Sequence, residues 1–310
     1  MRSLLRSVRI EIGSHSIKDR TEWRAWRAKA IEVTRCATAS TMSAFFGHHY
    51  TSFRAAMLEN FGSHAEDNHL AAAAKAHGEN TEEEAKREFI QVSERPCAIL
   101  CDGETSKIHL CMNVERLASA VIMTTPDMIV RFGNHKEVIE FKCPYFELRM
   151  PKMRKNRTVF QIANDYQLKN QHGKPSSFLQ AAVYAYVEGD ITRTRVCYYF
   201  TDDVEQAMLI YRYNLEDNYD EVERCILQSA DKINTELGKE PGDIKYRTLT
   251  SDKLFIQRLM TACCVKAELY NLSDLGTWEH CVLYEKTPNG SEEKRPEEPR
   301  EPGAWCGACC

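Results

Sequence analysis

Hydrophobic residues recur at helical spacing in several parts of the chain. In the segment 21–35, the apolar residues from Trp23 to Val33 follow one another at three- and four-residue intervals, which predicts a helix with one apolar face. Gly78 is a potential break in a second, longer helix. Helices or helix starts are expected over 38–43, 51–60, 66–91, 178–187 and 215–237.

Short apolar runs between turn signals predict strands in the middle of the chain. The segments 128–132 and 137–143 flank Gly133-Asn134, a pair typical of tight turns, so we expect them to form a hairpin. Further strands are expected over 118–123, 196–200 and 208–213. Helices, a hairpin, a helix, strands and a helix follow in that order, which predicts a mixed α/β fold.

Length and cysteine content narrow the class of protein. The chain has 310 residues, enough for one large domain or two modest ones, and its thirteen cysteines are odd in number and scattered. Such cysteines are typical of reduced thiols inside a cell. No apolar run reaches the length of about 18 residues that a membrane helix needs, and the N-terminus lacks the apolar core of a secretory signal. We therefore expect an intracellular protein of the nucleus or cytoplasm, neither secreted nor bound to a membrane.

The net charge of −4 is unevenly distributed. Residues 1–60 hold ten lysines and arginines against five acids, and residues 146–174 hold seven against two. Two basic regions on an acidic chain favour a local track for phosphates, and the alternative is a solvated surface. The candidate DNA contacts in the second region are Lys152, Arg154, Lys155 and Arg157.

Asp127, Glu140 and Lys142 are the strongest candidates for chemistry. Side chains alternate between the two faces of a strand, so Glu140 and Lys142 share one side while their neighbours face the core. The preceding strand of the hairpin brings Asp127 alongside them. Clustered carboxylates repel each other unless a cation lies between them, and oxygen ligands on a sheet suit Mg²⁺ or Mn²⁺. Lys142 is then placed to orient or deprotonate a water molecule, although the triplet alone also occurs by chance.

Two further polar residues fall in apolar surroundings. Helical spacing places Glu82 on one face with Ala85 and Phe89, so its side chain is expected to point toward the core. The alternative for Glu82 is a solvated, Glu-rich helix without a site. Gln180 is the one long polar side chain in the apolar segment 178–187, and a buried glutamine needs hydrogen-bond partners. A substrate phosphate, an attacking water or an ordinary backbone contact would each supply them.

The polar candidates belong to four motifs that follow one another along the chain. The motifs are Gly-x-x-x-Glu-x-x-Ala-x-x-x-Phe at 78–89, Thr-Pro-Asp at 125–127, Glu-Phe-Lys-Cys-Pro at 140–144, and Gln180 with tyrosines after it. Their order and spacing resemble the phage lambda-type exonuclease family, the YqaJ-type viral recombinase nucleases within the PD-(D/E)xK fold. Upstream, Trp23, Arg27 and the run Arg35-Cys-Ala-Thr-Ala-Ser40 resemble that family's Trp…Arg…Thr-Ala-Ser motif. The similarity covers residues 20–240.

This resemblance implies an α/β fold with a central mixed sheet flanked by helices, a restriction-endonuclease-like core, and Mg²⁺-dependent hydrolysis of DNA. Carried over by position, the metal ligands are Asp127, Glu140, the Phe141 carbonyl and Glu82, for one or two ions of Mg²⁺ or Mn²⁺. Lys142 would activate the nucleophile and Gln180 would assist it. Ser40 would hold a 5′-terminal phosphate together with Arg35 or Arg27. Arg35 is favoured because Arg27 is further from Ser40 than the family's motif allows.

The resemblance therefore predicts an exodeoxyribonuclease that prefers 5′-phosphates on linear duplex DNA, in recombination or in viral or mobile-element DNA processing. The alternatives are an endonuclease of the same fold acting on DNA or RNA, as in cap-snatching enzymes, and a DNA-binding module without catalysis. The other expected partners are a single-strand annealing protein and further copies of the chain. The expected organisation is an N-terminal extension (1–20), a lambda-exonuclease-like nuclease domain (21–245), a C-terminal helical extension (246–285) and a disordered tail rich in proline and charge (286–310).

Overall fold

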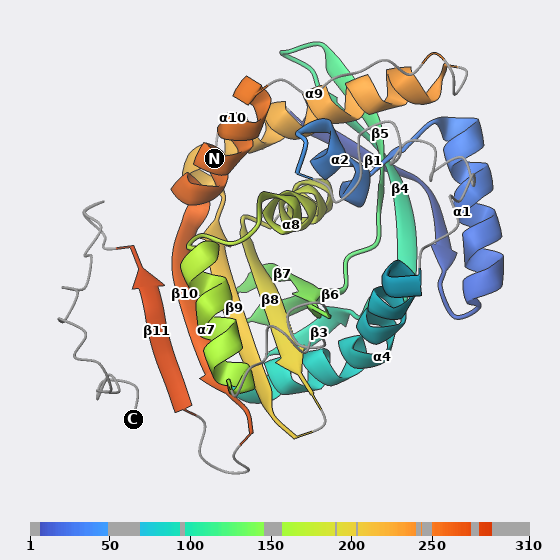
Figure 1. Ribbon diagram of the computed structural model, residues 1–310. Coiled ribbons are helices and arrows are strands. Elements are labelled where there is room, and N and C mark those ends of the chain that lie inside the picture. Colours follow the sequence, from blue (N-terminus) through green and yellow to red (C-terminus); the bar gives the residue numbers. More distant parts are fainter. Residues whose placement is uncertain are drawn as a thin grey trace.

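The computed structural model describes residues 7–48, 69–93, 97–145, 157–189, 191–202, 204–239, 243, 250–273 and 279–286, without the side chains of 69–72, 250 and 279–281. These residues form a mixed α/β protein in which two mixed sheets are flanked by helices (Figure 1). None of the helices in these ranges combines the length and the apolar character that crossing a membrane requires.

The larger sheet has seven strands and contains the hairpin that carries the candidate acids. Its strand order is β11-β10-β9-β8-β7-β6-β3, and only β7 and β8 run parallel. The strands are β3 (Ala98–Cys101), β6 (Met128–Phe132), β7 (His135–Lys142), β8 (Arg193–Thr201), β9 (Gln206–Asn214), β10 (Cys264–Asn271) and β11 (Glu279–Glu285). The parallel pair requires a crossover, which includes α7 (Val159–Lys169) and α8 (Pro175–Glu188).

The smaller sheet has the strand order β1-β4-β5-β2, and only β2 and β5 run parallel. The strands are β1 (Ser7–Ser16), β2 (Ala37–Thr38), β4 (Thr105–Asn113) and β5 (Ala118–Thr124). The short β2 links α1 (Arg20–Thr34) to α2 (Ala39–Phe45). This link holds the start of α2 at the edge of the smaller sheet.

Helix α8 lies between the two sheets, in the middle of the molecule (Figure 1). It contacts β5 of the smaller sheet, β7 and β8 of the larger one, and the helices α2, α9 (Tyr219–Leu237) and α10 (Thr250–Cys263). Its sequence explains this position, because a helix that is apolar on all sides must be surrounded by protein. Gln180 is the exception in its otherwise apolar middle part.

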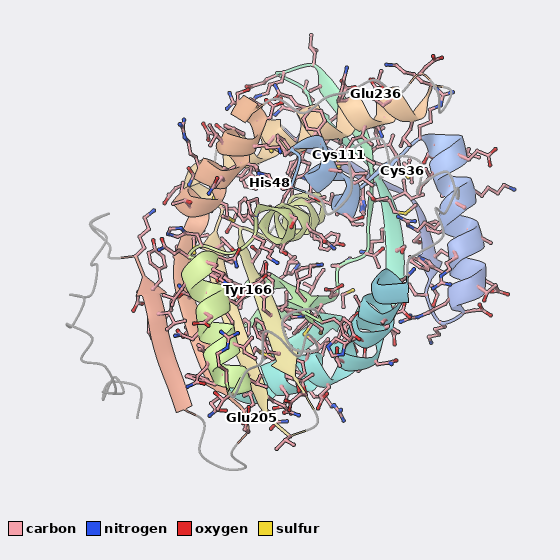
Figure 2. The ribbon with its side chains drawn as sticks, viewed as in Figure 1. Cys36, His48, Cys111, Tyr166, Glu205 and Glu236 are labelled. Carbon is pink, nitrogen blue, oxygen red and sulfur yellow. The ribbon has the colours of Figure 1, made fainter. Side chains whose placement is uncertain are left out.

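The two faces of the larger sheet are covered by different helices. On one face, α7 contacts β8, β9 and β10, and Tyr166 projects from it toward β8, where its ring centroid lies 4.9 Å from that of Tyr198 (Figure 2). On the other face, α4 (His69–Val92) packs Ala85 and Phe89 against Met128 of β6. The sheet is therefore buried on both sides at the hairpin, which holds the ends of β6 and β7 rigidly.

Many of the predicted elements are confirmed. The hairpin turns at Gly133, whose φ of 57° is left-handed, and α8 ends at Gly189. Helix α4 continues through Gly78 without a break, because the alanines before that glycine and the glutamates after it are good helix formers. The predicted helix 51–60 and the tail from 287 onward lie outside the described residues.

Two expected extensions are parts of the sheets. The segment 1–20 contains β1, which pairs with β4 along its full length. The segment 246–285, expected to be helical, contains α10 but then β10 and β11, which add two strands to the larger sheet beside β9. Pairing of these strands with distant parts of the chain decides their structure, and local sequence patterns do not show such pairing.

Candidate active site

The hairpin brings Asp127 and Glu140 together. Met128 of β6 pairs with Ile139 of β7, so the residue before Met128 lies beside the residue after Ile139. Asp127 Oδ2 accepts a hydrogen bond of 2.8 Å from the Phe141 backbone N–H, which fixes the carboxylate against β7. Asp127 remains half-buried at the wall of a cavity, whereas Glu140 is fully buried.

Lys142 connects the hairpin to α8. Its ammonium group donates to Glu140 Oε1 at 2.5 Å and to Gln180 Oε1 at 3.2 Å. The Gln180 amide in turn donates to the Tyr184 hydroxyl at 3.0 Å. The other oxygen of Glu140, Oε2, is buried and has no hydrogen-bond partner among the residues described. Gln180 therefore has the polar partners that its position in an apolar helix requires.

The pKa values of Asp127 and Glu140 indicate an excess of negative charge around these two carboxylates. Burial raises the pKa of Asp127, and the Glu140 and Glu82 carboxylates raise it further, against the smaller opposing effect of Lys142. Burial also raises the pKa of Glu140, although Lys142 partly offsets this. Burial lowers the pKa of Lys142, but the Glu140 and Asp127 carboxylates outweigh burial and raise it overall. Lys142 is therefore an ammonium group that donates hydrogen bonds.

Glu82 reaches the same cavity from α4. Its side chain is 36% exposed, and its Oε1 lies 3.2 Å from the ammonium group of Lys86. Its negative charge raises the pKa of Asp127, so the two carboxylates interact. The sequence analysis did not single out Lys86, although its place four residues after Glu82 is the spacing of a helical ion pair. Tyr184, which lines the cavity four residues after Gln180, was likewise not assigned a role.

The cavity has a volume of about 340 Å³ and is lined by two kinds of group. Acidic and polar side chains next to the hairpin and on α4 and α8 form one part of the lining, which we call the acidic wall. Arginines of α1 and the start of α2 form another part, which we call the arginine wall. The polar and aromatic residues that line it are Arg20, Trp23, Arg24, Arg27, Thr38, Ser40, Glu79, Glu82, Thr125, Asp127, Gln180 and Tyr184.

The arginine wall is held in place from two sides. Arg20 and Arg24 are ion-paired with Glu79 of α4, at 2.9 and 3.9 Å, and both arginine side chains are more than half exposed. The Trp23 indole N–H donates to the Ser106 hydroxyl at 2.7 Å, which anchors α1 to β4. Arg27 is half-buried and lines the same cavity.

Ser40 and Arg35, which the sequence analysis grouped together, lie in different places. Ser40 is in the first turn of α2, and its hydroxyl lies 3.1 Å from the Thr38 hydroxyl at the cavity. Arg35 ends α1 with a left-handed φ of 52°, and a Cβ added to Gly238 would lie 2.6 Å from Arg35 Nη1. The left-handed residue turns the arginine toward the end of α9, away from the cavity. The structure thus brings Ser40 together with Arg27.

The remaining site candidates take other positions. Phe141 lies between the two polar residues of β7, and its ring packs on Phe89 with the centroids 5.7 Å apart. Arg157 forms an ion pair with Asp165 of α7. The other three candidate DNA contacts, Lys152, Arg154 and Lys155, lie outside the described residues.

The acidic wall fits a divalent cation in its chemistry but does not form a complete ligand set. Among the residues described, no group of three or more His, Cys, Asp or Glu side chains lies close enough together to hold a metal ion. Lys142 is ion-paired with Glu140, and Lys86 with Glu82. The donors are all carboxylate oxygens, which Mg²⁺ and Mn²⁺ prefer, and Glu140 Oε2 is buried with no hydrogen-bond partner in the described part of the chain.

The described cysteines are all free, among them Cys36 and Cys111 in the interior (Figure 2).

No known family profile matches the sequence, and no curated protein matches it either. The function is therefore inferred from the residues of the cavity and from the motifs that supply them.

Proposed function

We propose that this protein is a Mg²⁺-dependent deoxyribonuclease, a 5′-phosphate-preferring exonuclease that acts on linear duplex DNA in recombination or in viral or mobile-element DNA processing. The observation that carries the proposal is the pairing of two walls in one cavity. The first wall has the carboxylates of Asp127 and Glu82 with Gln180, and the second has Arg27 and Ser40. Phosphodiester hydrolysis is favoured by a site that offers both a bound cation and fixed hydrogen-bond donors to the phosphate.

The acidic wall would hold the cation and orient the reacting groups. A bound divalent cation lowers the pKa of water and offsets the charge that develops on the phosphate. Asp127, Glu140 and Glu82 would hold it, with the Phe141 carbonyl. Lys142, held by Gln180 at 3.2 Å, would donate to the attacking water or to a phosphate oxygen. This supports an orienting role for the lysine, since its ammonium form cannot accept a proton.

The arginine wall would hold the end of the DNA strand. A guanidinium group binds phosphate oxygens in pairs, and Arg27 is the half-buried arginine of this wall. The Ser40 hydroxyl supplies a further donor. The volume of about 340 Å³ lies within the range of ligand pockets, so the cavity has room for a strand end.

The test compares linear and covalently closed circular duplex DNA with Mg²⁺. We expect degradation of the linear form alone, and none by Asp127→Asn, which keeps the size of the side chain but weakens the cation site. Cleavage of the circles would support the endonuclease alternative. DNA binding without any cleavage by the wild type would support a non-catalytic module. Self-association and a single-strand annealing partner belong to the same proposal and can be tested by sedimentation with and without that partner.

A further inference from the structure

Lys86 is a buried cation beside the cavity that the proposed function leaves without a role. Its side chain is 6% exposed, and its Nζ lies 3.2 Å from Glu82 Oε1, 3.0 Å from Glu83 Oε1 and 3.4 Å from Asp102 Oδ1. Of these three carboxylates, only Glu82 lines the cavity. Lysine usually keeps its ammonium group in water, so its burial here depends on these paired carboxylates.

The same ammonium group joins two separate segments of the chain. Glu82 and Glu83 belong to α4, whereas Asp102 belongs to the turn between β3 and β4. Lys86 Nζ also lies 3.5 Å from the Asp102 carbonyl oxygen, so that it contacts both the side chain and the backbone of the turn. Removal of the lysine would therefore release both Glu82 and this turn.

The turn lies directly against Asp127. Gly103 has a left-handed φ of +71°, and a Cβ added to it would lie 3.1 Å from the Asp127 carbonyl oxygen and 3.5 Å from Lys86 Nζ. Close packing of this kind allows the turn to support the backbone of Asp127. One ammonium group thus contacts Glu82 and also the turn that supports Asp127.

We propose that Lys86 is a positioning residue for this site. It fixes Glu82 directly and Asp127 through the turn at 102–103, and so sets how the two carboxylates approach a divalent cation. The inference rests on the proposed function and deepens it. Loss of an outer contact that orients a metal ligand typically weakens metal binding by about 10- to 100-fold.

The test measures Mn²⁺ binding to the full chain by calorimetry, without DNA. We expect Lys86→Met and Lys86→Gln to weaken binding by about tenfold. The matched control is Arg87→Met, which removes the same charge from the next, exposed residue of the helix. The thermal transition without metal shows whether each variant folds. If both Lys86 variants fail to fold, Asp102→Asn at a 46% exposed carboxylate tests the turn and should weaken Mn²⁺ binding in the same direction.

The double variant Glu82→Gln/Lys86→Gln shows whether the lysine acts through its partner. We expect its loss of Mn²⁺ affinity to be smaller than the product of the two single losses, because the groups share one interaction. Three results would overturn the inference. The double variant could lose Mn²⁺ affinity by the full product of the two single losses, the folded Lys86 variants could bind Mn²⁺ as the wild type does, or Arg87→Met could lose as much affinity as they do. A wild type that binds Mn²⁺ but cleaves no DNA would refute only the proposed nuclease function. A wild type that binds no Mn²⁺ would refute both.

Discussion

Replacement of Arg27 by alanine should abolish the preference for phosphorylated ends. Arg27 is half-buried in the cavity, whereas the side chains of Arg20 and Arg24 are 54% and 59% exposed. A partly buried charge is screened less by water and salt, so the terminal phosphate should depend mainly on Arg27. A charge-assisted contact contributes about 1.5–3 kcal/mol, which corresponds to a rate difference of about ten- to a hundredfold.

The assay measures initial rates on one duplex with either a 5′-phosphate or a 5′-hydroxyl, at saturating Mg²⁺. Wild-type protein should degrade the phosphorylated duplex about ten- to a hundredfold faster. Arg27→Ala should lose most of that difference and leave the slow rate on hydroxyl ends almost unchanged. Arg35→Ala is the matched control, because it removes the same side chain from a position beside Gly238, outside the cavity.

Two results would refute the reasoning. Equal rates on both ends with the wild type would remove the phosphate pocket and shift support to the endonuclease alternative. A preference that survives Arg27→Ala but disappears in Arg35→Ala would show that the motif spacing, and not the cavity, identifies the phosphate-binding arginine. The thermal transition of Arg35→Ala must be measured as well, since its contact with the end of α9 contributes to packing.

Three further changes test the site and its supports. Lys142→Ala should slow DNA cleavage by about two to three orders of magnitude, the usual effect of losing a fixed hydrogen-bond donor at the reacting groups, and Lys142→Arg should not restore the rate, because the larger planar group does not fit between its two acceptors. Gly103→Ala should destabilise the fold by about 1–2 kcal/mol, because alanine is strained in the left-handed conformation, and it should also weaken Mn²⁺ binding, because its Cβ would press on the Asp127 backbone. Gly133→Ala is the control: its φ is also left-handed, but its Cβ would meet no described atom within 4 Å, so it should destabilise the fold without changing Mn²⁺ binding. Glu137 of β7 is buried and ion-paired with Arg195 of β8, so Glu137→Gln should lower the free energy of unfolding by about 3 kcal/mol at pH 7, measured with denaturant. Burial raises the pKa of Glu137, but Arg195 lowers it overall, so the difference from wild type should shrink as the pH falls below about 4.5.

The sequence predicts the hairpin and α8 well because both are decided locally. Gly133-Asn134 can form the tight turn without strain, and the flanking apolar runs leave one pairing that buries them. Helix α8 is apolar on every side, so its burial follows from its composition alone. The same local pattern places Glu140 and Lys142 on one side of β7, and their ion pair agrees with it.

The sequence does not predict the partner of Ser40 or the burial of Lys86, because both depend on how the chain folds back on itself. Arg35 is nearer to Ser40 along the chain, but the left-handed end of α1 turns it away and the reversal through β2 brings Arg27 to the cavity. The strands β1 and β10 pair with segments far away in the sequence, so their own patterns were insufficient to identify them.

The charged groups around the cavity favour the joint binding of a cation and an anion. Lys86 is shared among three carboxylates and Lys142 is held by Glu140, so the acidic wall keeps an excess of negative charge. A divalent cation would offset that excess. The arginine wall includes Arg27, which favours an anion. A cation and a phosphate bound in one cavity would attract each other, so we expect them to bind more tightly together than separately, as a DNA end with Mg²⁺ would.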